Sequence, residues 1–418
     1  MKKMDNGTSG GGTIDDKVTS LPGIGELKNT QFAGYSPIVP KDQITEDSEC
    51  LFYWFVGTED YANKPTVIWT NGGPGSSSFW GFFLENGPYE IVDANANTKT
   101  PVMKYRPWAW NNKVNYMIFE HPLSVTLSYA KNDDNIPKTP EKGAEEYYNA
   151  LQNFLDKHPE LRKNKLILSG ESYAGTYLPL IANNIYLANQ NGGSNIDLAS
   201  IVLLDAWVDP KTQMTKDTQY AYNHGLISKK QKAALDKKYA DNMNGLDWAI
   251  HELCGVYMTN IAKFYDPPFG PVYDYLNRDD VRKAIHVDLN SPKLTENWSK
   301  TISENYSHYI NKSFAGLVDT LLDDAGFTIQ VINGLNDAKD CNFLGTEAWL
   351  ETLTSEAAKK YHEKDQVQWR DPSVNHVLGF VQDGGQLSWV KVLNAGHMAV
   401  GDQPAILDII LEKAGVNM

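Results

Sequence analysis

The stretch KLILSGESYAGTYLPLIA at residues 165–182 decides the fold, because it joins an apolar strand-like run to a helical run. Ser172 stands at the junction, with Gly170 before it and Ala174 after it. A sharp turn from a strand into a helix needs small neighbours, since the serine backbone is strained and its hydroxyl must stand clear of the sheet. The pattern predicts a nucleophile elbow in which the backbone N–H of Tyr173 points towards a developing oxyanion.

Further apolar runs on both sides of the elbow predict a sheet. They are LFYWFV (51–56), TVIWT (66–70), VNYMIFE (114–120), KLILS (165–169), SIVLLDAWV (200–208), FTIQVIN (327–333) and SWVKVLN (388–394). Between two of them, Thr139 can cap a helix that begins at Pro140 and continues with apolar periodicity to Leu161. Strand, helix, strand is typical of a mainly parallel sheet.

The pattern changes after Pro210, where a charged and helix-rich stretch replaces the alternating strands and helices. We therefore expect a core that is interrupted by an insertion. The predicted divisions are a flexible N-terminal tail (1–30), the first part of the core (31–210), a mainly helical insertion or cap (211–325) and the second part of the core (326–418).

Two further residues follow strand-like runs and complete a catalytic set with Ser172. Asp337 lies in INGLNDAKDCN and His397 lies in NAGHMAVGDQP. Serine, then acid, then histidine is the chain order of α/β-hydrolases, in which a mostly parallel central sheet is flanked by helices. His121, in EHP after a strand, is the only comparable rival for the base.

Composition excludes several classes of function. The apolar fraction of 41% is that of a globular protein, and a net charge of −14 disfavours nucleic acid and anionic membrane surfaces. No apolar run reaches the ~18 residues of a membrane span. We expect no metal or organic cofactor. The polar N-terminus lacks the apolar middle of a signal peptide, which indicates the cytoplasm for a complete chain and secretion for a chain whose signal was removed.

Four segments together resemble the serine carboxypeptidase family. They are WTNGGPGSSS with FLENGPY, GESYAG, NGLNDAKDCNFLG and NAGHMAVGDQP, and weaker likeness extends from Phe32 to the C-terminus. The resemblance implies that the N–H of Gly73 is a second oxyanion donor beside that of Tyr173. It also implies that the terminal carboxylate of a peptide is held by Trp69, Asn71, Glu85 and Glu171.

Two carboxyls that face a carboxylate must hold protons, so the resemblance predicts raised pKa values for Glu85 and Glu171. Substrate binding should then weaken as pH rises, and peptide cleavage should have an acidic optimum. An exopeptidase needs such a constellation, because only a free terminal carboxylate should place the scissile bond over the nucleophile.

Several positions depart from the family pattern. Ser76 stands where cysteine is usual, and EHPLSVTLSY (120–129) replaces a glycine-rich loop that borders the substrate site. Asp205 occupies the place of an asparagine. The family places the triad acid three residues before a cysteine, and this position is Ala338 here. If the chain carries one inserted residue, the acid is Asp337. Asp340 is the alternative.

The predicted function is a serine carboxypeptidase that removes C-terminal residues from a peptide through an acyl-enzyme on Ser172. Two alternatives remain: an acyltransferase or biosynthetic tailoring enzyme that uses the same acyl-enzyme on a small acyl substrate, and a noncatalytic binding or protective protein. The sequence leaves the oligomeric state and the preferred terminal residues open.

Overall fold

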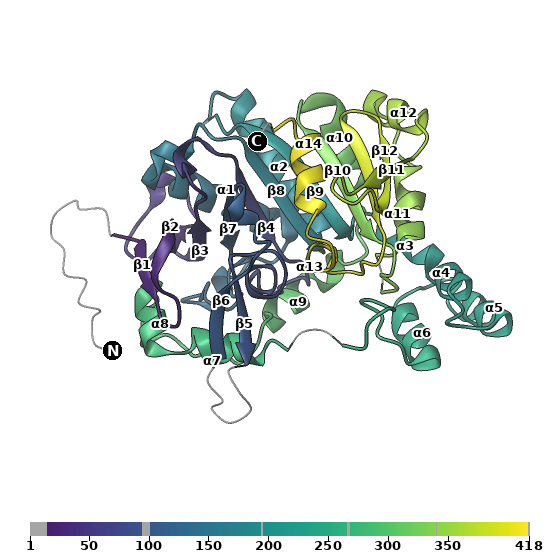
Figure 1. Cartoon of the computed structure of the whole chain (residues 1–418), viewed down its shortest axis with the longest axis horizontal. Helices are drawn as coiled ribbons and strands as arrows, with labels where there is room; N and C mark the ends of the chain where they lie inside the picture. The colour runs from purple at the N-terminus through teal and green to yellow at the C-terminus, as the bar shows by residue number, and fades with distance from the viewer. Residues whose placement is uncertain (1–14, 94–100, 194, 266–267, 340, 417–418) are drawn as a thin grey trace.

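The computed structural model describes residues 15–93, 101–193, 195–265, 268–339 and 341–416, and it contains a large central sheet (Figure 1). The strand order is β1-β2-β3-β7-β4-β8-β9-β10-β13-β12-β11. The strands are β1 (Lys17–Leu21), β2 (Gly25–Pro37), β3 (Cys50–Val56), β4 (Thr66–Thr70), β7 (Asn115–Phe119), β8 (Leu166–Ser172), β9 (Leu198–Ala206), β10 (Thr328–Gly334), β11 (Val367–Arg370), β12 (Val377–Asp383) and β13 (Leu387–Val392). A separate hairpin pairs β5 (Tyr89–Asp93) with β6 (Pro101–Tyr105).

The middle of the sheet is parallel, from β7 through β4, β8, β9 and β10 to β13. The strands outside this block pair antiparallel. In a parallel sheet the carboxyl ends meet at one edge, so the loops after β4, β8, β10 and β13 gather there. This topology confirms the predicted α/β-hydrolase fold.

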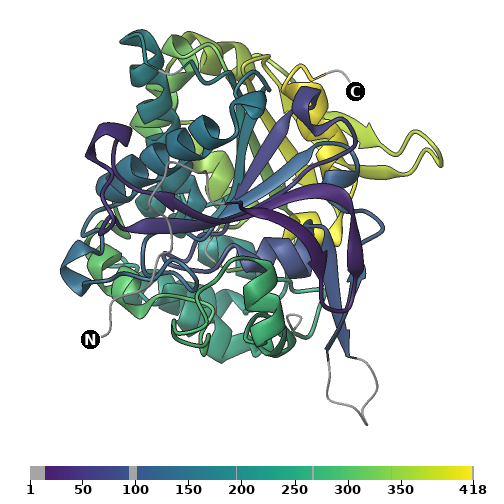
Figure 2. The ribbon, with the colours of Figure 1, turned by 90° about the vertical axis from the view of Figure 1, so that its left-hand side faces the viewer.

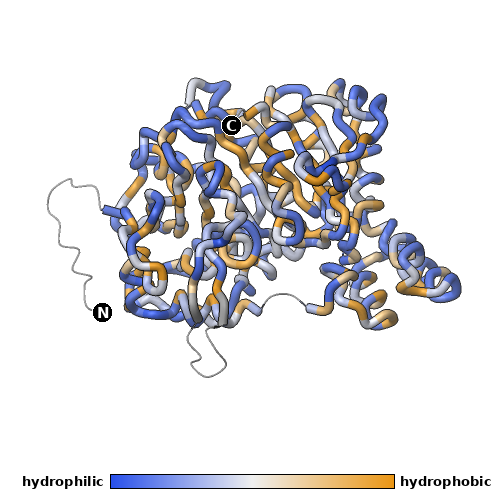
Figure 3. Tube along the Cα trace, in the orientation of Figure 1, coloured by the Kyte–Doolittle hydropathy of each residue, from blue (hydrophilic) through white to orange (hydrophobic). Residues whose placement is uncertain are grey.

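Helices cover both faces of the sheet (Figure 2). They are α1 (Pro140–Lys157), α2 (Ala174–Gln190), α3 (Pro210–Gln213), α4 (Asp217–Asn223), α5 (Lys229–Lys238), α6 (Leu246–Cys254), α7 (Gly270–Leu276), α8 (Asp279–Ala284), α9 (Lys300–Tyr306), α10 (Ala315–Asp324), α11 (Phe343–Leu350), α12 (Glu356–His362), α13 (Ala399–Asp402) and α14 (Ile406–Lys413). Helices α1, α2 and α10 bury apolar side chains against one face, and α7 and α14 do so against the other. Figure 3 shows the hydrophobic residues concentrated along the central strands.

Helix α1 begins where the sequence predicts. Thr139 has extended backbone angles, and its hydroxyl oxygen accepts a hydrogen bond from the N–H of Lys142 at 3.1 Å. Pro140 follows as the first helical residue, where its missing N–H costs nothing. Within the described parts of the chain, no helix has the length and apolarity needed to cross a membrane.

The predicted tail at residues 1–30 is wrong from Lys17 onwards. Strands β1 and β2 pair with each other at the edge of the sheet, and Val18 and Leu21 are buried. Asp16 lies just before them and is tied to His158, with 2.9 Å between carboxylate oxygen and Nε2. An edge strand buries few side chains, so its sequence shows little alternation. Residues 1–14 lie outside the described residues.

Between β9 and β10 the described residues form helices and no strand. Helices α4, α5 and α6 extend away from the body of the molecule (Figure 1). They share a small apolar cluster of their own, formed by Ala221, Ile227, Leu235, Leu246 and Ile250. The domain boundaries at 210 and 326 stay a prediction.

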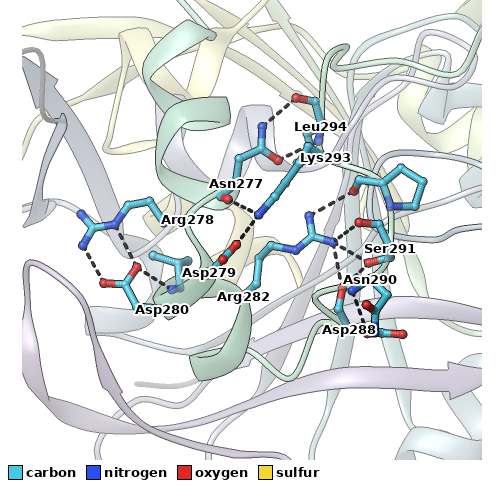
Figure 4. Close-up of polar contacts among 12 residues, drawn as sticks. Asn277, Arg278, Asp279, Asp280, Arg282, Asp288, Asn290, Ser291, Lys293 and Leu294 are labelled. Carbon is cyan, nitrogen blue, oxygen red and sulfur yellow. Dashed lines mark hydrogen bonds and ion pairs between the residues drawn. The ribbon is translucent and has the colours of Figure 1, made fainter. Parts of the chain in front are cut away.

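A buried arginine holds the second half of the insertion in place (Figure 4). The guanidinium of Arg282, on α8, donates to the backbone carbonyls of Asp288, Ser291 and Pro292 at 3.0 to 3.1 Å. Nearby, Lys293 donates to the carbonyl of Asn277 at 2.6 Å. These bonds anchor the chain a few residues before it reaches the cleft described below.

Candidate active site

The serine elbow is built by local backbone constraints. Strand β8 ends at Ser172, whose φ of +61° lies in the left-handed region, and α2 begins two residues later. A Cβ on Gly170 would lie 2.2 Å from the carbonyl oxygen of Thr70, and one on Gly175 would lie 2.8 Å from the N of Trp207. The small residues that the sequence showed around the serine are therefore required by close backbone contacts.

The glycine loop after β4 lies directly against the elbow. A Cβ on Gly72 would approach the backbone nitrogen of Tyr173 to 2.2 Å, so only glycine fits there. The N–H of Gly75 donates to the hydroxyl of Tyr177, on α2, at 3.1 Å. Gly73 has φ +109° and lines the same cleft as Ser172. Gly73 and Tyr173, the two predicted oxyanion donors, are thus brought close together from separate strands.

His397 is paired with the first of the two candidate acids. Its Nδ1 lies 2.7 Å from Oδ2 of Asp337, and the aspartate side chain is fully buried. The other oxygen, Oδ1, accepts a hydrogen bond from the backbone N–H of Lys339 at 2.9 Å. The alternative acid, Asp340, lies outside the described residues. The loops after β10 and β13 thereby assemble an acid and an imidazole in the geometry of a catalytic pair.

The rival histidine has different surroundings. His121 is buried, and its ring packs edge-on against Tyr147 and Tyr177 with centroids 5.1 and 4.9 Å away. Burial lowers the pKa of its imidazole to about 3. Among the described residues neither ring nitrogen of His121 has a hydrogen-bond partner, so the orienting carboxylate that a general base uses is missing there.

Ser172 and His397 line one cleft of about 270 Å³. The other lining residues are Asn71, Gly72, Gly73, Ser76, Trp80, Glu171, Thr259, Asn297, Trp298, Lys339 and Met398. Thr259, Asn297 and Trp298 belong to the insertion, and no catalytic or substrate-binding motif of the sequence marked them. Asn297 is held by its carbonyl oxygen, which accepts from the N–H of Ser77 at 2.8 Å. The insertion therefore forms part of the cleft wall.

All four predicted carboxylate-binding residues are buried, and three of them are connected by hydrogen bonds. Trp69 Nε1 donates to Oδ1 of Asn71 at 2.8 Å, and Asn71 Nδ2 donates to Oε1 of Glu171 at 2.7 Å. Asn71 and Glu171 line the cleft, whereas Trp69 and Glu85 lie behind them. Trp69 therefore orients Asn71 so that its amide faces Glu171.

Both glutamates of this group are easier to protonate than exposed carboxyls. Burial raises the pKa of Glu85 to about 7, although hydrogen bonding with Glu171 and Asn71 opposes part of the rise. Burial, and then the charge of Glu85, raises the pKa of Glu171 well above its ordinary value. Ionising both of two adjacent buried carboxyls is unfavourable in free energy, so the pair retains protons.

Two of the departures from the family pattern also lie near the site. Glu120, at the start of the altered 120–129 loop, accepts a hydrogen bond from the hydroxyl of Ser77 at 2.6 Å, beneath the glycine loop. Asp205 is buried at the end of β9 and accepts from the N–H of Gly334 at 3.0 Å. Burial, and then the charge of Asp337, raises the pKa of Asp205. Both carboxyls therefore support the backbone of site loops.

The family model for serine carboxypeptidases matches residues 22–269 and 252–413, which together span nearly the whole chain. The chain belongs to the serine carboxypeptidase family. The probable serine carboxypeptidase CPVL of Dictyostelium discoideum is 29% identical over 381 residues, covering 85% of this chain and 73% of that protein. The pheromone-processing carboxypeptidase KEX1 of Phytophthora infestans is 28% identical over 438 residues, covering 96% of this chain and 71% of its own.

A solved carboxypeptidase structure shares the fold. The prohormone-processing carboxypeptidase Kex1 of Saccharomyces cerevisiae superposes with a TM-score of 0.76, at 22% identity, over 92% of this chain and 91% of that chain. In the described parts of this family member, no cluster of three or more histidine, cysteine or acidic side chains is arranged to hold a metal ion.

Proposed function

We propose that this protein is a serine carboxypeptidase that releases residues from the free C-terminus of peptides. One observation carries the proposal: Ser172 and His397 share a cleft with the hydrogen-bonded pair Asn71 and Glu171. A nucleophile, a base and a carboxylate-binding pair in one cleft are the parts that an exopeptidase requires.

In the proposed reaction, His397 takes the proton of the Ser172 hydroxyl as the serine attacks the last peptide bond. Asp337 orients the imidazole through Nδ1 and stabilises its charged form. The N–H groups of Gly73 and Tyr173 donate to the oxyanion that develops. His397 then gives its proton to the leaving amine, and a water molecule, activated by the same imidazole, hydrolyses the acyl-enzyme.

We further propose that the buried glutamates make cleavage favoured at acidic pH. While the Glu85 and Glu171 pair is protonated, it can donate to the terminal carboxylate of the substrate. As pH rises through about 7, the value to which burial raises the pKa of Glu85, the pair becomes more anionic and repels that carboxylate. We expect kcat/KM for a peptide with a free C-terminus to fall from acid to weakly alkaline pH; a flat or rising profile would contradict this.

An acyltransferase would use the same acyl-enzyme but pass it to an alcohol or amine. The retention of Asn71 and Glu171 favours the peptidase, because a transferase without a terminal carboxylate to bind has no use for them. A noncatalytic protein is disfavoured by the close pairing of Asp337 with His397.

One experiment separates the three functions. Wild-type protein and Ser172→Ala are incubated with a peptide pool whose members carry free or amidated C-termini, and the products are followed by mass spectrometry. The peptidase predicts serine-dependent loss of single residues from the free peptides alone. Acylated adducts formed with an added alcohol or amine would support the transferase, and no serine-dependent change would support the binding protein.

A further inference from the structure

A short segment of the helical insertion, residues 258–263, lies between the two loops that carry Asp337 and His397. The carbonyl of Met258 accepts from the N–H of Ala338 at 2.9 Å, and the carbonyl of Thr259 accepts from the N–H of His397 at 2.7 Å. The N–H of Ile261 donates to the carbonyl of Asn336 at 3.0 Å. This tether segment thus contacts both catalytic loops through backbone hydrogen bonds.

The tether segment packs against the histidine loop without space for an additional atom. A Cβ on Gly396 would lie 2.4 Å from the carbonyl oxygen of Thr259 and 2.5 Å from the Cβ of Asn260. The backbone just before His397 therefore takes its position directly from the tether segment. Packed backbone of this kind transmits a displacement instead of absorbing it.

A single carboxylate joins the tether segment to the histidine loop. Asp402 ends the short helix α13, and its side chain is 5% exposed. Its Oδ2 accepts from the N–H of Gly396 at 2.9 Å and from Nδ2 of Asn260 at 2.8 Å. Its Oδ1 pairs with the ammonium of Lys263. Backbone, amide and ammonium donors thus meet at one buried acid.

The same helix packs against the carboxylate-binding group. A Cβ on Gly401 would lie 3.4 Å from the Cα of Glu85. Helix α13 is therefore held on three sides, by the insertion and the histidine loop through Asp402 and by the segment of Glu85 through Gly401. From this fixed position the Asp402 carboxylate can hold the loop of His397.

We propose that Asp402 is a positioning residue that aligns His397 by locking the histidine loop to the tether segment of the insertion. The helical insertion then contributes to the alignment of the base as well as to the cleft wall. Misplacement of a reacting group by about 1 Å can lower a rate by about 10²-fold. For its kinetic consequence, the inference rests on the proposed function.

The test compares Asp402→Ala and Asp402→Asn with wild type. We expect Asp402→Ala to lower kcat about 10²-fold while KM changes little, because the carboxylate-binding pair stays in place. Asp402→Asn keeps one acceptor oxygen for Gly396 and Asn260, so it should recover part of kcat. Asp408→Ala is the matched control, since Asp408 is an exposed aspartate on α14 that pairs with Lys113 at the surface; its kcat and KM should stay at wild-type values.

A second readout does not depend on any substrate. The Nδ1–H proton of His397, bound to Asp337, is followed as the low-field proton signal of the imidazole by NMR. We expect the signal to shift or broaden in Asp402→Ala, to be partly restored in Asp402→Asn and to be unchanged in Asp408→Ala. If wild type cleaves no peptide, the proposed function fails, but this signal still tests the positioning role.

The inference is overturned if Asp402→Ala folds and retains both the wild-type proton signal and the wild-type kcat. It is also overturned if its only effect is a lower melting temperature, or a higher KM with kcat unchanged. If Asp402→Ala does not fold, Asn260→Ala removes one of the bonds to the same carboxylate. That variant should show a smaller loss of kcat and a smaller change in the signal, and wild-type behaviour in both would reject the proposal.

Discussion

The two halves of the cleft are held by different kinds of contact. The nucleophile half comprises residues 69–85 and 170–176, where the ends of two neighbouring strands touch and glycines allow the approach. The histidine half comprises residues 258–263, 334–339 and 395–402, where two loops meet a segment from a distant part of the chain. Close backbone contacts at glycines dominate the first half, whereas in the second half a steric contact at Gly396 is combined with a network of long-range hydrogen bonds.

This difference predicts which kind of substitution damages each half. In the nucleophile half an added methyl group has nowhere to go, so small substitutions should damage folding. In the histidine half Gly396 is packed as tightly, but hydrogen bonds of side chains and backbone also align the catalytic groups, so isosteric changes to those polar side chains should damage catalysis while the fold persists.

The largest expected effect comes from the acid of the histidine half. Asp337→Asn should lower kcat about 10⁴-fold with little change in stability, because the amide favours the wrong tautomer of His397. Steady-state kinetics and a thermal melt measure the two quantities. Asp340→Asn is the control, and we expect it to retain most of the activity. A severe loss in Asp340→Asn alone would assign the acid to that residue.

The next effect sharpens the contrast in the nucleophile half. Gly170→Ala should destabilise the fold by about 1–3 kcal/mol, since its methyl group meets the carbonyl of Thr70 at 2.2 Å. Denaturant unfolding measures the change. Gly316→Ala is the control: no other atom lies within 4 Å of the added methyl group on helix α10, so we expect a neutral or slightly stabilising effect below about 1 kcal/mol. If the two substitutions changed the free energy of unfolding equally, the steric explanation for Gly170 would be wrong.

The smallest effect concerns the pH dependence. Glu171→Gln removes one of the two carboxyls whose raised pKa values keep them protonated at acid pH. The wild-type kcat/KM should fall as pH rises through about 7, and the variant should lose about tenfold less over the same range. Glu145→Gln, at an exposed position on α1, should keep the wild-type profile. Identical pH profiles of kcat/KM for Glu171→Gln and wild type would show that these glutamates do not cause the pH dependence.

Strands that are buried on both faces were predictable from their apolar runs. Each of the seven strand-like runs overlaps an observed strand, and Thr139 caps α1 as expected. Strands β1, β2, β11 and β12, the outer two at each side of the sheet, escaped prediction, because a half-exposed strand carries a weak hydrophobic pattern. The exposed Val367 on β11 illustrates this.

Ser172, its small neighbours and the glycine loop were apparent in the sequence, because their chemistry is a matter of adjacent residues and backbone sterics. The order of Ser172, Asp337 and His397 along the chain was equally visible. Which residues meet His397 from far away was decided only by the tertiary structure. Thr259 reaches the backbone of His397 and Asn260 reaches Asp402 because the insertion folds back onto two loops, and contacts between segments so distant in sequence leave no periodic or local signal in the chain.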